Sequence, residues 1–393
     1  MISVTKLLAS HSEHYGDHLR YHRETKDTHN GTSKGRGPVV VWNCTQRCNL
    51  NCIHCYSDAS SSCGPGELTY EAGKHLIDDL SEFNVPVLLF SGGEPLLRKD
   101  FFELAEYAVT KGIRVTISTN GTLIDKEMAR DIKKIGVGYV GISLDGIGEN
   151  NDEFRGKPGA FENALEGVRN CLKEGQRVGL RFTINKRNYQ DIPGIFQLIE
   201  EEQIPRMCFY HLVYSGRGSN MIQEDISPDT TRTVIDDIIK NTIYFDQKGD
   251  QKEILMVANH ADGVYIYKQA EKYAPERQEH IYELLRQNGG NRSGIAIACV
   301  DSQGNVHPDQ FTLNHTFGNV KERSFGDIWA DTSQNEILKG LKNRKPLLKG
   351  RCGQCKWLQV CNGNFRARAE AYYKDFWAPD PACYLTDKEI GLA

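Results

Sequence analysis

Three early cysteines have a spacing suited to metal chemistry. Cys48, Cys52 and Cys55 are separated by three and then by two residues, and they follow residues 39–42, a β-branched run typical of a strand. Thiolates at this spacing can hold one corner of an iron–sulfur cubane, whose usual protein ligands are cysteines. Three protein ligands leave one iron of a 4Fe-4S cluster free to bind another molecule. The spacing therefore predicts a reactive metal centre.

A structural zinc site is the alternative interpretation of the same loop. Zinc in such sites takes four closed ligands, and Cys44, His54 or Cys63 could supply the fourth. The position of the three cysteines, directly after the first expected strand, favours the iron–sulfur cluster.

Four more cysteines lie close to the end of the chain. Cys352 and Cys355 are separated by two residues, Cys361 follows after five more, and Cys383 completes a four-thiolate set. Two cysteine pairs are also how zinc ribbons bind their metal, so zinc and a second iron–sulfur cluster both stay open. The presence of the first cluster favours iron. Cys299 is either a substitute ligand or a buried thiol, as isolated cysteines usually are.

Glycine-rich and polar turns follow the next expected strands. Gly92, Gly93 and Glu94 come directly after an apolar run. Glycine lets a backbone approach a ligand closely, and Glu94 complements an ammonium group. Ser143 ends another apolar run, and Arg155 could grip a carboxylate through two hydrogen bonds. The alternatives are an ordinary turn and a surface arginine. Weaker candidates at the same kind of position are Thr119, Asn120, Gly121 and Asn185.

Apolar runs alternate with amphipathic helical patterns through the first half of the chain. Continuous apolar strands separated by helices are typical of parallel βα units. Six such strands predict an α/β fold with a partial (βα)6 barrel, whose chemistry sits at the C-terminal edge of the strands. The expected strands are residues 39–42, 85–90, 113–118, 139–144, 178–184 and 207–213, and the expected helices are residues 71–83, 101–110, 126–135, 160–173 and 191–201.

The chain divides into four parts by composition. Residues 1–36 are polar with weak periodicity and are expected to form an N-terminal arm, loose beyond its first helical turns. The barrel is expected over residues 37–216, and a helical connecting region over residues 217–298. Residues 299–393 break into short segments rich in Cys, Gly and Asn. This composition is typical of a small domain organised around a metal site.

Charge and hydropathy exclude several classes of function. The 393 residues carry a net charge of −4, so no overall field draws the protein to nucleic acid or to an anionic membrane. No apolar run approaches the roughly 18 residues of a membrane span, and the first residues lack the apolar core of a signal peptide. Twelve cysteines in such a chain argue for metal or redox use rather than for disulfides. We therefore expect a cytoplasmic protein without nucleic-acid or membrane partners.

The cysteine loop and the glycine turn together resemble the radical S-adenosylmethionine (SAM) superfamily. The motif Cys48-Asn-Leu-Asn-Cys52-Ile-His-Cys55-Tyr56, one βα unit before Ser91-Gly-Gly-Glu-Pro95, carries the resemblance. It implies a 4Fe-4S cluster on the three cysteines and SAM, whose cleavage gives a 5′-deoxyadenosyl radical. It also implies a low-potential electron donor such as ferredoxin or flavodoxin. The SAM contacts that it implies are Tyr56, Gly92, Gly93, Glu94, Asn120, Ser143 and Arg155.

The late cysteines resemble the SPASM/Twitch extension of this superfamily, which carries auxiliary clusters. The position four residues after Cys361 is Phe365, whereas the full seven-cysteine form has a further ligand there. The resemblance therefore implies one auxiliary 4Fe-4S cluster, held by Cys352, Cys355, Cys361 and Cys383.

Almost the whole chain resembles, more narrowly, the radical SAM enzymes of haem biosynthesis. Residues 1–7 and 38–43 at the start and residues 307–311, 361–366 and 380–387 near the end carry this resemblance. It implies a modified sirohaem substrate, didecarboxysiroheme, from which two acetate side chains are removed to give Fe-coproporphyrin III. The sibling reaction of haem d1 biosynthesis removes two propionates from the same substrate, and the N-terminal residues favour acetate removal. Peptide modification, which also uses the SPASM extension, and a non-enzymatic scaffold are the further alternatives.

A tetrapyrrole substrate is flat, apolar and edged with carboxylates. It calls for aromatic walls, for arginines and, where its iron is ligated, for a histidine. Any single candidate in the sequence is equally a surface or structural residue. The candidates are Arg181, Arg206, His211, Arg217, Arg366 and Arg368, with His307 and His315 as iron ligands.

Overall fold

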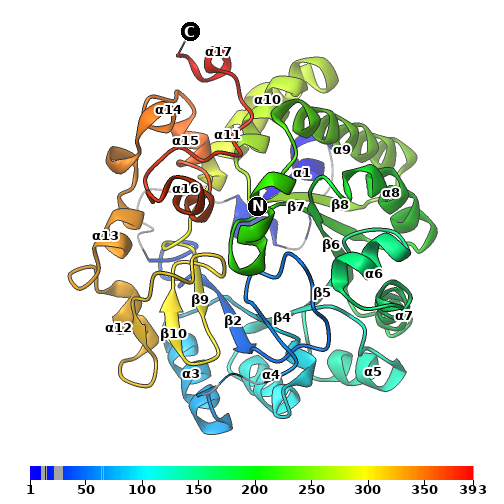
Figure 1. Cartoon of the computed structure of the whole chain (residues 1–393), viewed down its shortest axis with the longest axis vertical. Coiled ribbons are helices and arrows are strands. Elements are labelled where there is room, and N and C mark those ends of the chain that lie inside the picture. The colour runs from blue at the N-terminus through cyan, green and yellow to red at the C-terminus, as the bar shows by residue number, and fades with distance from the viewer. Residues whose placement is uncertain (10–13, 15, 22–29, 63, 65, 393) are drawn as a thin grey trace.

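Parallel strands form a curved sheet at the centre of the protein, with helices around it (Figure 1). The computed structural model describes residues 1–9, 14, 16–21, 30–62, 64 and 66–392, and within them the strands form one eleven-stranded sheet. Cys63, which the sequence offers as a zinc ligand, lies outside the described residues. From β2 to β8, successive strands are neighbours and pair in parallel. The strands are β2 (Val39–Thr45), β3 (Val87–Gly92), β4 (Arg114–Thr119), β5 (Tyr139–Ser143), β6 (Val178–Ile184), β7 (Arg206–His211) and β8 (Glu253–Val257).

This order is that of an open barrel, so the expected α/β fold with a partial (βα)6 barrel is confirmed. Amphipathic helices cover its outer face. In α3 (Tyr70–Glu82), Thr69 caps the first turn and Leu76, Ile77 and Leu80 are buried. Each such buried side chain contributes about 1.5–3 kcal/mol. The other helices of this layer are α4 (Phe101–Thr110), α5 (Lys126–Lys134), α6 (Glu149–Arg155), α7 (Ala160–Lys173) and α8 (Ile192–Glu201).

The described part of residues 1–36 does not form the loose arm that its polar composition predicts. β1 (Ile2–Ser3) pairs antiparallel with β8, and α1 (Val4–Leu8) is buried over most of its length. Arg20, in α2 (Asp17–Arg20), forms an ion pair with Glu253 of β8 at 2.7 Å. The segment therefore covers β8, an edge that would otherwise expose unpaired backbone groups.

The connecting region is helical, as expected, but it also contains a strand. β8 lies between α9 (Pro228–Lys248) and α10 (Ala261–Tyr273) and pairs in parallel with β7. α11 (Gln278–Asn288) completes the region. The strand has only five residues and stands between long helical patterns, and its pairing with β7 decides its conformation.

The C-terminal domain continues the barrel sheet. β9 (Ile297–Val300) pairs in parallel with β2, and β10 (Asn305–His307) and β11 (Gly318–Asn319) extend it antiparallel. The expected boundary at residue 299 therefore falls inside β9. The domain is thus joined to the strand that leads into the first cysteine loop. Its helices are α12 (Phe325–Ala330), α13 (Glu336–Lys342), α14 (Gly350–Gly353), α15 (Leu358–Cys361), α16 (Arg366–Tyr373) and α17 (Asp387–Ile390).

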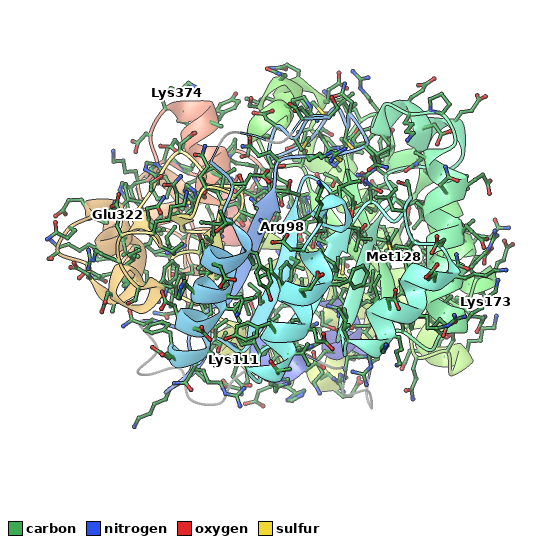
Figure 2. The ribbon with its side chains drawn as sticks, turned by 90° about the horizontal axis from the view of Figure 1, so that it is seen from below. Arg98, Lys111, Met128, Lys173, Glu322 and Lys374 are labelled. Carbon is green, nitrogen blue, oxygen red and sulfur yellow. The ribbon has the colours of Figure 1, made fainter. Side chains whose placement is uncertain are left out.

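The C-terminal domain and α7 lie on opposite sides of the barrel, and 3-10 helices complete the chain. In Figure 2, Glu322 and Lys374 of the C-terminal domain lie across the barrel from Lys173 at the end of α7. The helices of the described residues are all too short or too polar to cross a membrane. The 3-10 turns are η1 (Pro95–Leu97), η2 (Tyr189–Asp191), η3 (Gly216–Glu224), η4 (Pro275–Arg277) and η5 (Lys345–Leu347).

Candidate active site

The three cysteines of the first loop lie together beyond the C-terminal end of β2. Cys48 and Cys55 pack against a buried cluster of Leu50, Cys52 and Ala160, and all three cysteines are free thiols. The backbone holds the loop: Cys48 N donates to Ser60 O at 2.6 Å, and Arg217 Nε donates to Cys52 O at 2.9 Å. Burial raises the pKa of the Cys48 thiol to about 11. A thiolate in this position needs a bound cation, which fits a loop that ligates iron.

A cavity with a free volume of about 100 Å³ opens inside the barrel beside this loop. Ser91, Ser118 and Ser143 line it from β3, β4 and β5, and Arg181 lines it from β6. Phe311 reaches it from the C-terminal domain. His54 and Tyr56 of the cysteine loop also line it, so the loop and the strand ends share one cavity.

The glycine turn after β3 touches the cysteine loop. Gly92 has a φ of +122°, and a Cβ on it would lie 2.4 Å from Thr45 O. A Cβ on Gly93 would lie 2.2 Å from Arg47 O, and Gly93 N donates to Thr45 O at 2.7 Å. Only glycine permits this approach. The two glycines therefore fix the backbone that leads into Cys48, and their contact with SAM stays a prediction.

Glu94 lies beneath this turn, with none of its side chain exposed. Its carboxylate accepts hydrogen bonds from Thr119 Oγ1 and Asn120 N, both at 2.8 Å, and from Leu96 N at 3.2 Å. Burial raises its pKa to about 7, against the opposing effect of these donors. In the described structure Glu94 joins the turn after β3 to the turn after β4. Its pairing with the amino group of SAM stays a prediction.

We expect Glu94→Gln to leave the iron content unchanged and to weaken SAM binding. The side-chain amide nitrogen of Gln would face N–H and O–H donors that now bond to a carboxylate oxygen of Glu94. This mismatch should lower the free energy of unfolding by about 1–3 kcal/mol. The pKa of Glu94 is near 7 in the folded protein and 4.5 ordinarily. As the pH rises, Glu94 therefore ionises in the unfolded chain before it ionises in the folded protein. Between these values the wild type should lose about 1.4 kcal/mol of stability per pH unit relative to the variant.

Urea unfolding of both proteins across this pH range measures the effect, and equilibrium dialysis with labelled SAM measures binding. Glu103→Gln, on the exposed face of α4, is the matched control and should change neither. A difference in stability between wild type and Glu94→Gln that does not vary with pH would contradict the raised pKa.

Arg155 and Asp145 form a charged pair beside the second cysteine. Arg155 pairs with Asp145 and its Nη1 donates to Cys52 Sγ at 3.5 Å. Asp145 also lies 3.4 Å from His54 Nε2, and burial lowers the pKa of His54 to about 4. The guanidinium therefore sets a positive charge against the thiol, where a cluster would carry negative charge. Its contact with the SAM carboxylate stays a prediction.

Asp145 and the neutral His54 also belong to the site, where Asp145 lies between Arg155 and His54. The sequence does not predict this arrangement. The signal for Asp145 was its place two residues after Ser143, at the end of a strand. His54 was weighed only as a zinc ligand, yet its ring packs on Phe154 with 4.6 Å between ring centroids.

Asn120 and Tyr56 connect the cysteine loop to the strands. Asn120 Nδ2 lies 3.9 Å from Cys48 Sγ and donates to Asn49 Oδ1 at 2.8 Å. Tyr56 OH donates to Asn43 Oδ1 at 3.0 Å and lies 2.8 Å from Ser91 Oγ. The structure thus brings Tyr56, Ser143 and Arg155 to the cavity and sets Asn120 against its cysteine loop. The weaker candidate Asn185 is buried and bonds to the backbone of Thr183 and Arg187.

Of the basic residues considered for a tetrapyrrole, Arg181 and His211 line the cavity. Arg181 Nη1 donates to Ser118 Oγ at 2.6 Å, and His211 Nε2 lies 3.0 Å from Asp262 Oδ2. Arg206 pairs instead with Glu253 at 3.2 Å, and Arg217 holds the cysteine loop.

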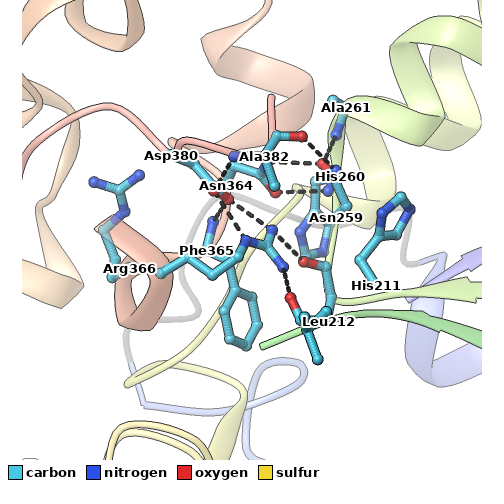
Figure 3. A network of polar contacts seen from close by, with 12 residues as sticks. His211, Leu212, Asn259, His260, Ala261, Asn364, Phe365, Arg366, Asp380 and Ala382 are labelled. Carbon is cyan, nitrogen blue, oxygen red and sulfur yellow. Dashed lines mark hydrogen bonds and ion pairs between the residues drawn. The ribbon is translucent and has the colours of Figure 1, made fainter. Parts of the chain in front are cut away.

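Arg366 and Arg368 are structural, contrary to the substrate-binding hypothesis. Both are at least 98 % buried; their exposed fractions are 2 % and 0 %. Arg366 donates to the backbone, including Ala378 O at 2.6 Å. Arg368 pairs with Asp380 at 2.7 Å in a network that joins the barrel to the C-terminal domain (Figure 3). All three nitrogens of the Arg368 guanidinium donate to carbonyls or to Asp380, and both terminal nitrogens of Arg366 donate to carbonyls, so the fold engages both side chains.

The two histidines proposed as iron ligands also lie outside the cavity. His307 Nδ1 lies 2.9 Å from His315 O, and His307 Nε2 lies 3.3 Å from Asp301. His315 Nε2 lies 2.8 Å from Glu370. Both rings are therefore held by partners within the C-terminal domain, and the histidines that reach the cavity are His54 and His211.

The four late cysteines line one small cavity. Burial raises the pKa of the Cys383 thiol to about 12, so these thiols also call for a cation. Within the described residues, no three His, Cys, Asp or Glu side chains are close enough to bind a single metal ion. Thiols spread around a cavity fit a polynuclear cluster. Cys299 is a buried thiol of β9 and does not line this cavity.

Comparisons with known proteins match two parts of the chain to family models. Residues 42–199 match the model of the Radical SAM superfamily, and residues 293–356 match that of an iron–sulfur cluster-binding domain, SPASM. Fe-coproporphyrin III synthase of Methanosarcina barkeri is 56 % identical over 100 % of this chain and 99 % of its own length. Pre-heme d1 synthase of Dinoroseobacter shibae is 43 % identical over 97 % of this chain and 93 % of its own.

A solved structure shows the same fold. Streptococcus suis SuiB bound to S-adenosylmethionine superposes with a TM-score of 0.69 at 18 % identity, over 89 % of this chain and 78 % of that chain. At this identity the likeness speaks for the fold alone.

Proposed function

This chain belongs to the radical SAM superfamily, and we propose that it removes two acetate side chains from didecarboxysiroheme to form Fe-coproporphyrin III. As a member it is a radical SAM enzyme that uses a 4Fe-4S cluster and SAM, with an additional iron–sulfur cluster in its C-terminal domain. The observation that carries the proposal is the 56 % identity, over the full chain, to a Fe-coproporphyrin III synthase.

The residues of the chain hold the reactants and keep water away. When bound, the reduced cluster and SAM supply a 5′-deoxyadenosyl radical, which can abstract a hydrogen atom from an unactivated carbon. Cys48, Cys52 and Cys55 are the cluster ligands, and Arg155 places its positive charge beside them. The cavity lies inside the barrel, where strands and the C-terminal domain exclude water from a reactive species.

The cavity also offers groups that suit a flat, carboxylate-edged substrate. Tyr56 and Phe311 form an aromatic wall, with ring centroids 5.1 Å apart, and Phe365 packs behind Phe311 at 5.5 Å. Arg181 Nε is buried without a hydrogen-bond partner among the described residues. It is therefore a free donor for a carboxylate at the wall of the cavity.

The reaction needs an electron for each SAM cleaved. We therefore propose as partner a low-potential electron donor such as ferredoxin or flavodoxin. The reducing conditions that keep such clusters and twelve thiols intact favour a cytoplasmic location.

Removal of two propionates is the second candidate reaction. It is favoured by the 43 % identity to the pre-heme d1 synthase over 97 % of the chain. The higher identity and coverage of the Fe-coproporphyrin III synthase favour acetate removal.

Anaerobic incubation with SAM, dithionite and didecarboxysiroheme tests the proposal. We expect 5′-deoxyadenosine and a tetrapyrrole that has lost two acetate groups and kept all propionates, as mass spectrometry can determine. Loss of propionates would establish the second reaction instead. An unmodified tetrapyrrole, with SAM still cleaved, would contradict both and point to another substrate.

A further inference from the structure

The segment that carries three of the four late cysteines is strongly basic. Residues 337–369 contain nine Lys or Arg and no Asp or Glu, although acidic residues outnumber basic ones in the whole chain by 52 to 48. Such a local excess of positive charge attracts acidic partners. The nine residues are Lys339, Lys342, Arg344, Lys345, Lys349, Arg351, Lys356, Arg366 and Arg368.

Three of the nine residues are buried, four are exposed, and Lys342 and Arg351 are partly buried. Arg344, Arg366 and Arg368 are buried and donate to backbone carbonyls, so they belong to the fold. Four lysines carry their charge to the surface, and Lys388 of α17 joins them. The four are Lys339, Lys345, Lys349 and Lys356.

Part of this charge gathers in one groove, which we call the basic groove. It is lined by Lys268, Lys356, Trp357, Thr386, Lys388 and Glu389. Its single carboxylate is already engaged, because Glu389 pairs with Arg232 and, at 2.8 Å, with Lys268. Lys356 and Lys388 have no carboxylate partner among the described residues. The groove therefore keeps a surplus of positive charge.

The basic groove lies next to a ligand of the auxiliary cluster. Trp357, which lines it, donates its backbone N–H to Cys355 Sγ at 3.4 Å and its indole N–H to Glu389 O at 2.8 Å. Gly353 and Gln354, just before Cys355, are exposed. The first cysteine loop instead lines the cavity inside the barrel, through His54 and Tyr56. A redox group bound in the groove would thus be separated from the auxiliary cluster by one side chain, that of Trp357.

We infer that the basic groove is the docking site of the acidic one-electron carrier protein that reduces this enzyme. The inference rests on the proposed function in that the reaction consumes electrons. In the step concerned the carrier is oxidised by one electron and the auxiliary cluster is reduced by one, with no bond or proton transferred. Complementary charge orients such partners and speeds their encounter.

Reduction of the reconstituted enzyme by a purified reduced flavodoxin, without tetrapyrrole, tests the docking site. The rate is followed by the loss of cluster absorbance as the carrier concentration rises. Lys356→Glu/Lys388→Glu should raise the half-saturating flavodoxin concentration about 10-fold at low salt and less at high salt, where the charges are screened. Reduction by dithionite, which needs no docking, should be unchanged.

Lys173→Glu is the matched control, because Lys173 is exposed at the end of α7, which lies at the lower right of Figure 1, away from α17 at the top. It should behave as the wild type with both reductants. A second pair, Lys268→Gln/Lys388→Glu, changes the groove without altering a neighbour of Cys355 in the chain and should give the same shift with full iron content.

Unchanged flavodoxin dependence in both groove variants would overturn the inference, as would an equal loss with dithionite. Lysine-dependent binding of an anionic vesicle or a polynucleotide that flavodoxin does not displace would also overturn it. The dithionite-driven assay tests the proposed function separately. An unmodified tetrapyrrole in that assay would contradict the proposed function but not the docking site.

Discussion

Replacing Cys48, Cys52 and Cys55 together with alanine is expected to remove about half of the iron and to reduce 5′-deoxyadenosine formation to background. The reconstituted wild type should hold about eight irons, four for each cluster, and the variant about four. The late cysteines line a separate cavity, so their cluster should persist. Colorimetric iron analysis and chromatography of the SAM products measure the two effects.

A buried thiol outside both sites provides the matched control. Cys171 is buried in α7 and lines neither cavity, so Cys171→Ala should keep all its iron and its SAM cleavage. Full iron in the triple variant, or zinc in place of iron in the wild type, would contradict the ligand assignment.

The first cysteine loop could be predicted from the sequence because its chemistry is local. The spacing of Cys48, Cys52 and Cys55 predicts that they lie together, as the structure shows, and the glycine turn is recognisable from Gly92 and Gly93. The barrel strands are likewise local signals: the apolar run 178–184 is the strand β6, with the expected bounds. Both kinds of pattern need no knowledge of distant contacts.

The roles of buried polar residues could not be predicted, because burial is decided by distant parts of the chain. The sequence indicates a ligand contact for Glu94 but not its hydrogen bonds to Thr119 and Asn120 of the next turn, which come from a separate strand end. Arginine is usually exposed, so Arg366 and Arg368 were assigned to a substrate. The strand β8 was missed for the same reason, since its pairing with β7 bridges a long helix.

Arg368 shows what such a residue does in this fold. It donates to Asp380, to Leu212 O after β7 at 3.1 Å and to Ala258 O after β8 at 2.6 Å (Figure 3). Burial alone would raise the pKa of Asp380, but the Arg368 guanidinium more than offsets it and lowers that pKa below its ordinary value. Asp380 stands three residues before Cys383. One guanidinium therefore joins the barrel to the loop that carries an auxiliary-cluster ligand.

Arg368→Met is accordingly expected to lower the free energy of unfolding by about 3–5 kcal/mol, because it leaves a buried carboxylate without its partner. Urea unfolding under anaerobic conditions measures the loss. Lys349→Met breaks the exposed pair with Asp375 (2.6 Å) and should change stability little, as exposed ion pairs do. Arg368→Met/Asp380→Leu should recover part of the loss, since it removes the uncompensated charge. If Arg368→Met lowers the free energy of unfolding no more than Lys349→Met does, the guanidinium does not join the two parts of the fold. The hypothesis that Arg368 binds a substrate carboxylate would then stand again.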